Sequence, residues 1–158
     1  MTVHSFSSAA GAAAPLTRAR VSGSLPVWSL SLGCPKNRVD TEHLLGSLGM
    51  PVHSVEHMGR ARLVFINTCG FIEPAVRESI RSILDAVERL GRCKRRPLLA
   101  VAGCMVGRYG VKDLAADLPE VDLWLPTGEL ENWPAMVREA LGLPAAPAAP
   151  GRLLSTGP

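Results

Sequence analysis

The chain has 158 residues, of which 47% are hydrophobic and 20% are charged, as is usual for a globular protein. This length fits a single domain with a real core, and a formal net charge of +3 does not argue for direct nucleic-acid binding. No apolar run approaches the roughly 20 residues of a membrane span, and no secretory signal is visible. We therefore expect a cytoplasmic protein without membrane contacts, in which thiols stay reduced.

The two ends of the chain differ in composition from its middle. Residues 1–26 are rich in Ala, Ser and Gly, carry two arginines and contain no acidic residue. They lack a periodic apolar face, so we expect a disordered tail, with an organellar transit peptide as the alternative. Residues 142–158 contain a Pro- and Ala-rich run typical of a linker to a further domain. The folded domain is therefore expected at residues 27–141.

Five short runs rich in β-branched or apolar residues predict five strands. The unbroken apolar run at 63–66 is typical of a central strand that is buried on both faces of a parallel sheet. The run at 52–55 is short and is predicted to lie at an edge of the sheet. The predicted strands are residues 27–32, 52–55, 63–66, 98–102 and 121–125.

Helical patterns separate these strands. In the first helix Asn37 is predicted to be the cap, with Asp40 three positions on in the capping-box arrangement. The longest helix follows Cys69, and shorter helices are predicted near residues 114–118 and 130–141. The residues predicted to face the core are Val39, Leu44, Leu45 and Leu48 in the first helix, and Val76, Ile80, Ile83, Leu84, Val87 and Leu90 in the longest.

The alternation of strands and helices predicts an α/β fold, a three-layer sandwich around a five-stranded parallel sheet. Right-handed crossovers favour the flavodoxin-like strand order 2-1-3-4-5. In that order the first, third and fourth strands are neighbours, about 4.8 Å apart. Ligands of such folds bind at the carboxyl ends of the strands, so we expect the functional site at that edge.

Three cysteines follow directly after those three neighbouring strands, each beside a glycine. They are Cys34, Cys69 and Cys104, and the two intervals between them are equal at 35 residues. Because the carboxyl ends of parallel strands meet at one edge, we expect the three sulfurs to converge on a metal centre with one position left open. Cys93 lies in a basic turn where a helix returns to the opposite edge, so we expect it to take no part.

The residues alone leave other roles for these cysteines open. A cysteine at a strand end often packs without further function. A reactive thiol is favoured at a helix N-terminus, but no arginine stands six positions after any of the three cysteines, as a phosphatase-like loop requires. Zinc is a third possibility, completed by His43, His53 or His57, although no spacing demands it. Iron–sulfur ligation by three thiolates explains the set most economically.

Several polar residues near the cysteines have expected roles of their own. Asn67 and Thr68 precede the second cysteine, and are expected either to hydrogen-bond the sulfurs of the site or to brace the loop. Lys36 is expected to offset thiolate charge near the first cysteine. The basic run at 92–96 is more typical of a solvated turn than of a nucleic-acid patch.

Three motifs carry a resemblance to a known family: SLGCPKN at residues 31–37, NTCGFI at 67–72 and GC at 103–104. Together they resemble the N-terminal domain of radical-SAM methylthiotransferases, and the likeness extends over roughly residues 27–141. The proline after the first cysteine and the glycine after the second are similar to the ribosomal-protein branch of that family. The tRNA-modifying branch typically has GCQMN at the first position and a serine after the second cysteine.

The resemblance implies that the full-length enzyme adds a methylthio group to an aspartate of a small-subunit ribosomal protein. It implies that Cys34, Cys69 and Cys104 hold one [4Fe–4S] cluster whose fourth iron lacks a protein thiolate. A second [4Fe–4S] cluster and S-adenosylmethionine would belong to a radical-SAM domain, in cis or in trans, whose C-x3-C-x2-C motif this sequence lacks. We therefore expect the chain alone to be inactive. The alternatives are the same domain of a tRNA-modifying enzyme, or a stand-alone metal-binding or electron-transfer module.

Overall fold

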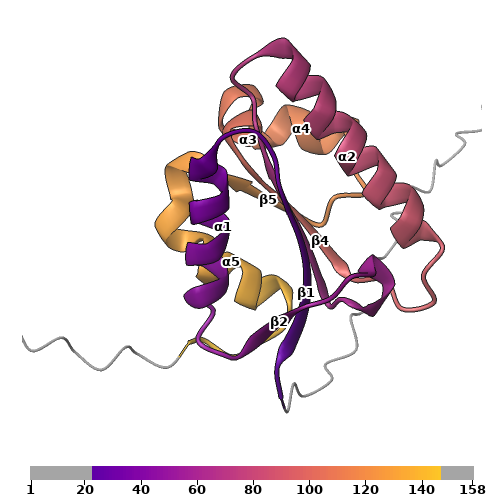
Figure 1. Cartoon of the computed structure of the whole chain (residues 1–158), viewed down its shortest axis with the longest axis vertical. Coiled ribbons are helices and arrows are strands. Elements are labelled where there is room, and N and C mark those ends of the chain that lie inside the picture. Colours follow the sequence, from indigo (N-terminus) through magenta and orange to yellow (C-terminus); the bar gives the residue numbers. More distant parts are fainter. Residues whose placement is uncertain (1–22, 147–158) are drawn as a thin grey trace, which may run out of the picture.

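The computed structural model describes residues 23–146 of the chain. Five strands form a parallel sheet in the order β2-β1-β3-β4-β5, which confirms the predicted fold class and strand order (Figure 1). β1 begins two residues before the predicted strand, inside the segment predicted as a tail. Residues 1–22 of that tail and residues 147–158 of the predicted linker lie outside the described residues. The strands are β1 Leu25–Ser31, β2 Val52–Ser54, β3 Leu63–Thr68, β4 Leu98–Gly103 and β5 Leu123–Pro126.

Helices cover both faces of the sheet. They are α1 Pro35–Gly46, α2 Glu73–Gly91, α3 Cys104–Tyr109, α4 Val111–Asp117 and α5 Trp133–Ala140, with 3-10 turns η1 Met58–Arg60 and η2 Thr127–Asn132. Figure 1 shows α1 and α5 on one face, and α2, α3 and α4 on the other. The result is the predicted three-layer sandwich. No helix in the described part of the chain is both long enough and apolar enough to span a membrane.

The central strand β3 supplies both hydrophobic cores, because its successive side chains point to opposite faces. Val64 and Ile66 pack with the helices α2, α3 and α4, whereas Leu63 and Phe65 pack with α1 and α5. All four side chains are fully buried. Each contributes about 1.5–3 kcal/mol relative to an exposed position. The sheet is therefore a well-packed platform for the loops at its carboxyl edge.

The first helix buries a polar stripe, and this overturns two predictions. Asn37 is not the cap, because Cys34 occupies the cap position and Pro35 begins the helix. Val39, predicted to face the core, is 60% exposed. The buried residues of α1 are Asn37, Asp40, Thr41 and Leu44. The pattern of apolar residues misled the prediction because, next to the ends of the strands, this helix must supply hydrogen-bond partners to backbone groups.

The longest helix, α2, buries a narrower stripe than predicted. Val76, Ile83 and Leu90 are buried as expected, but Ser79 and Ala86 complete the stripe. Ile80 and Leu84 lie at its margin, where they are 37% and 50% exposed, so their assignment to the core was wrong. After β4 the chain forms two short helices, α3 and α4, where one was predicted near residues 114–118.

Candidate functional site

The three predicted cysteines lie at the carboxyl edge of the sheet, on loops that leave adjacent strands. Cys34 caps α1 just after β1, Cys69 follows the last residue of β3, and Cys104 begins α3 directly after β4. Pairing of β1 with β3 and of β3 with β4 brings these strand ends side by side. All three thiols are free; Cys34 is exposed and the other two are half-buried. The predicted placement at one edge is therefore confirmed.

Glycines allow the three cysteine loops to touch one another. A Cβ atom added to Gly33 would lie only 2.8 Å from the Sγ of Cys69. A Cβ added to Gly70 would lie 2.6 Å from the Cα of Met105 and 3.1 Å from the carbonyl carbon of Cys104. Any larger residue would push the loops apart, so the first loop rests against the second cysteine and the second loop against the third.

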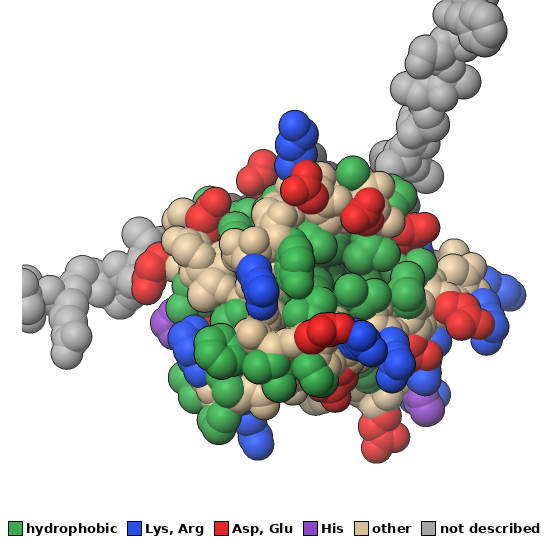
Figure 2. Space-filling view, turned by 90° about the horizontal axis from the view of Figure 1, so that it is seen from above, with side chains coloured by type: hydrophobic (Ala, Val, Ile, Leu, Met, Phe, Trp, Pro, Cys, Tyr) green, Lys and Arg blue, Asp and Glu red, His purple; other side chains and the backbone are tan. Residues whose placement is uncertain are grey.

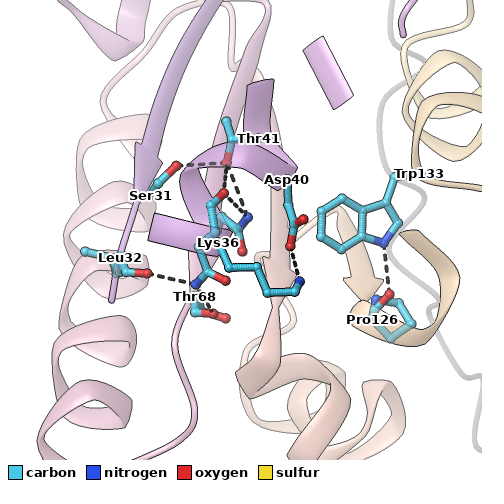
Figure 3. Close-up of polar contacts among 10 residues, drawn as sticks. Ser31, Leu32, Lys36, Asp40, Thr41, Thr68, Pro126 and Trp133 are labelled. Carbon is cyan, nitrogen blue, oxygen red and sulfur yellow. Dashed lines mark hydrogen bonds and ion pairs between the residues drawn. The ribbon is translucent and has the colours of Figure 1, made fainter. Parts of the chain in front are cut away.

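A buried hydrogen-bond network lies directly behind the loops (Figure 3). The side-chain amide of Asn37 donates to the carbonyl oxygens of Leu32 at 2.8 Å and Thr68 at 3.0 Å. The amide of Asn67 donates to the carbonyl oxygen of Asn37 at 2.8 Å, and Thr41 donates to the same oxygen at 2.9 Å. These bonds tie the start of α1 to the ends of β1 and β3, and so hold the first two cysteine loops in register.

Asn67 and Thr68 brace the loops, which is one of their two predicted roles. The hydroxyl of Thr68 donates to the carbonyl oxygen of Ala102 at 2.6 Å and links the end of β3 to β4. Thr41 also takes part, with its hydroxyl 2.8 Å from that of Ser31. The sequence does not predict this hydroxyl contact, although Ser31 begins the first cysteine motif, because the two partners lie ten residues apart on different elements.

A cation lies on the first turn of α1, two residues after Cys34. The Nζ of Lys36 donates to Oδ2 of Asp40 at 2.5 Å, one turn along α1 (Figure 3). This hydrogen bond is the main reason that the pKa of Lys36 is raised, with desolvation opposing it and the negative charges of Asp40, Cys104 and Cys34 adding to it. The direction of this shift is compatible with a Lys36 that offsets thiolate charge, and that role stays a prediction.

Cys93 lies at the other end of the molecule. It follows the C-terminal end of α2, and this helix of 19 residues is about 28 Å long. Its Sγ is 3.6 Å from the carbonyl oxygen of Arg89, and the side chain packs against the core beside Gly59. Cys69 precedes the start of the same helix, so the two sulfurs are separated by its length. The prediction that Cys93 stands apart is confirmed.

The donor set at the carboxyl edge suits a soft metal group. Within residues 23–146, no three Cys, His, Asp or Glu side chains lie close enough together to hold a single metal ion. The predicted convergence of the three sulfurs on a metal centre is therefore not shown by the described residues. Three free thiols on touching loops have the soft donor chemistry that an iron–sulfur cluster requires. The ligand role of Cys34, Cys69 and Cys104 stays a prediction.

Figure 2 views the molecule from above Figure 1, onto this edge of the sheet. Hydrophobic side chains, among which cysteines are coloured, surround a central hollow, and charged side chains stand around them. Exposed apolar residues belong to the segments that leave this edge, with Phe71 86% and Ile72 54% exposed in the loop after Cys69. A group bound in the hollow would therefore have a largely apolar surround, which strengthens its electrostatic contacts.

Comparison with known proteins identifies the family of this chain. The model of a family described as uncharacterized protein family UPF0004 matches residues 27–126, which include all three cysteine loops. The ribosomal protein uS12 methylthiotransferase RimO of Nitratidesulfovibrio vulgaris (strain DP4) is 63% identical over 134 residues, which are 85% of this chain and 31% of that protein. The protein of the same name from Lawsonia intracellularis is 48% identical over 136 residues, which are 86% of this chain and 31% of that protein.

A relative with lower sequence identity has the same name. The uS12 methylthiotransferase of Geobacter sulfurreducens is 42% identical over 121 residues, which are 75% of this chain and 26% of that protein. The chain thus spans about a third of the length of the curated relatives it matches. The resemblance predicted from the cysteine motifs is confirmed. The chain belongs to the family UPF0004, and it matches the N-terminal domain of the ribosomal protein uS12 methylthiotransferases.

Proposed function

We propose that this chain is the iron–sulfur-binding N-terminal domain of an enzyme that adds a methylthio group to an aspartate of ribosomal protein uS12. In this proposal Cys34, Cys69 and Cys104 are the thiolate ligands of a [4Fe–4S] cluster. The observation that carries it is the direct contact of three cysteine loops at the carboxyl edge of three adjacent strands. The names of the relatives support the ribosomal-protein substrate over tRNA.

In this proposal the residues of this chain bind the cluster, balance its charge and hold its loops in place. The three thiols bind the cluster, Lys36 offsets its negative charge, and the network of Asn37 and Asn67 keeps the loops from separating. When bound, a cluster held by only three protein thiolates supplies an iron at which a sulfur species can attach. S-adenosylmethionine, a second [4Fe–4S] cluster and the contacts with uS12 belong to the remainder of a cytoplasmic enzyme, with the radical-SAM domain in cis or in trans.

Anaerobic reconstitution with iron and sulfide tests the binding part of the proposal. We expect a brown protein that contains about four irons per chain. A colourless product with about one zinc and no bound iron would contradict the cluster assignment. Air must be excluded, because oxygen destroys many such clusters.

The substrate part is tested by joining or mixing this chain with a radical-SAM domain from its own gene or a neighbouring gene. Incubation with uS12 and S-adenosylmethionine should increase the mass of uS12 by one methylthio group at an aspartate. Modified tRNA in place of modified uS12 would support the tRNA-modifying alternative. The absence of any C-x3-C-x2-C reading frame within or beside the gene would favour a stand-alone electron-transfer module.

A further inference from the structure

The backbone of Cys69 is held by one buried side chain from α2. The hydroxyl of Ser79 accepts a hydrogen bond from the amide nitrogen of Cys69 at 3.2 Å and donates one to its carbonyl oxygen at 3.1 Å. Ser79 is fully buried. One hydroxyl group therefore satisfies both polar backbone groups of the cysteine, which fixes the peptide planes on either side of it.

A second side chain, from α3, holds the next residue of the same loop. Nη1 of Arg108 donates to the carbonyl oxygen of Gly70 at 2.7 Å. Arg108 lies on α3, one turn after Cys104, so this bond links the loop of the second cysteine to the helix that begins with the third. Its guanidinium group also lies over the ring of Tyr109, 5.5 Å from the centroid, and this contact restricts its own motion.

The position of Ser79 argues for a role beyond packing. It interrupts an apolar stripe between Val76 and Ile83, where alanine would be a better helix former. A serine in a helix commonly bonds the carbonyl oxygen one turn back, whereas this hydroxyl reaches Cys69, ten residues earlier. The loop has little apolar anchorage of its own, because Phe71 is 86% exposed. Its conformation therefore depends on polar contacts.

We propose that Ser79 and Arg108 are positioning residues, which fix the direction in which the Cys69 thiol faces the site shared with Cys34 and Cys104. The inference rests on the proposed function, because it assigns a metal-bound role to that thiol. Groups that orient a ligand without touching the metal change metal affinity by about 10- to 100-fold when they are removed. In the described part of the chain, neither residue has a hydrogen bond to Cys34, the exposed cap of α1.

Two variants with matched controls test this inference in the reconstituted 158-residue chain. In Ser79→Ala and Arg108→Gln we expect iron to be lost to a chelator at least about tenfold faster than in the wild type. The electron paramagnetic resonance spectrum of the reduced cluster should also change, which a purely structural role would not cause. Ser79→Thr, which keeps the hydroxyl, should restore both properties. Ser82→Ala and Arg81→Gln, on the helix α2 that carries Ser79, are the controls and should match the wild type.

Each outcome decides between distinct conclusions. Wild-type iron retention and spectrum in both Ser79→Ala and Arg108→Gln would overturn the inference and leave the proposed function intact. Equal iron loss in the control variants would also overturn it, because the effect would then be a general weakening of α2. If Ser79→Ala does not fold, the comparison of Arg108→Gln with Arg81→Gln decides, since both positions are exposed. A wild-type chain that binds no iron overturns the proposed function and the inference together.

Discussion

The two edges of the sheet hold the same type of residue in contrasting surroundings. At the carboxyl edge, three cysteines stand on loops backed by buried polar side chains such as Asn37 and Asn67. At the amino edge, Cys93 packs against apolar residues. At the same edge Arg96, just before β4, forms an ion pair with Asp122, just before β5, and donates to both of its carboxylate oxygens at 2.8 and 2.7 Å.

The carboxyl edge contains buried polar atoms that lack hydrogen-bond partners among the described residues. The side-chain carbonyl oxygens of Asn37 and Asn67 are buried and find no hydrogen-bond donor in the described part of the chain. Such groups destabilise a fold unless something is gained in return. Both lie behind the cysteine loops, which is compatible with the site proposed at the carboxyl edge, whereas the ion pair at the amino edge joins the starts of two neighbouring strands.

Replacing single cysteines should give the largest contrast between the edges. Serine at Cys34, Cys69 or Cys104 should reduce the bound iron from about four to less than about one per chain, because each substitution removes one of the three proposed ligands. Serine at Cys93 should leave the iron content unchanged. Iron and sulfide analysis after anaerobic reconstitution measures the effect. Iron loss in Cys93→Ser, or full iron content in any of the other three, would contradict the assignment.

The contact between loops can be broken without touching a cysteine. Gly70→Ala should lower the free energy of unfolding by about 3 kcal/mol, the upper end of the usual range for overpacking. Its Cβ would meet the backbone of Met105, which cannot turn aside as a flexible side chain would. Gly46→Ala, where nothing lies within 4 Å of the new Cβ, is the control and should not destabilise the protein. Denaturant unfolding of the metal-free chain compares them.

A variant at the amino edge should separate stability from metal binding. The carboxylate of Asp122 accepts hydrogen bonds from Arg96 and, at 2.7 Å, from the amide nitrogen of Leu99. Asp122→Ala should lower the free energy of unfolding by about 1–2 kcal/mol, since a charged acceptor is lost. Iron content after reconstitution should equal that of the wild type. A loss of iron at temperatures where the variant is folded would mean that the two edges are coupled.

Much of this arrangement follows from the sequence alone. The apolar run at 63–66 predicts a central strand because only a parallel sheet covered on both faces hides it. Equal spacing then predicts that Cys34, Cys69 and Cys104 share an edge, because each interval is one strand–helix unit. Cys93 is separated by the same reasoning, since a helix carries the chain back across the sheet.

What the sequence could not predict depends on contacts between loops that are distant along the chain. The sequence predicts that Asn37 caps the helix. In the fold its amide instead donates to the carbonyl oxygens of Leu32 and Thr68, which only the folded sheet brings close to it. Val39 was misplaced for the same reason, because the buried face of α1 is polar there. The role of Ser79 is not predictable from helical periodicity either, since its partner, Cys69, lies outside the helix.

The smallest expected effect compares two ion pairs on the same helix. Lys36–Asp40 and Arg38–Glu42 share the i,i+4 spacing, but the side chain of Asp40 is only 10% exposed, whereas both members of the second pair are at least 66% exposed. A double-mutant cycle with Met for the cations, Asn for Asp40 and Gln for Glu42 should give a coupling of about 1 kcal/mol for the first pair and at most about 0.5 for the second. High salt should weaken the second pair more, because exposed charges are screened more strongly. Equal couplings would mean that the burial of Asp40 at the carboxyl edge adds nothing to the strength of the first pair.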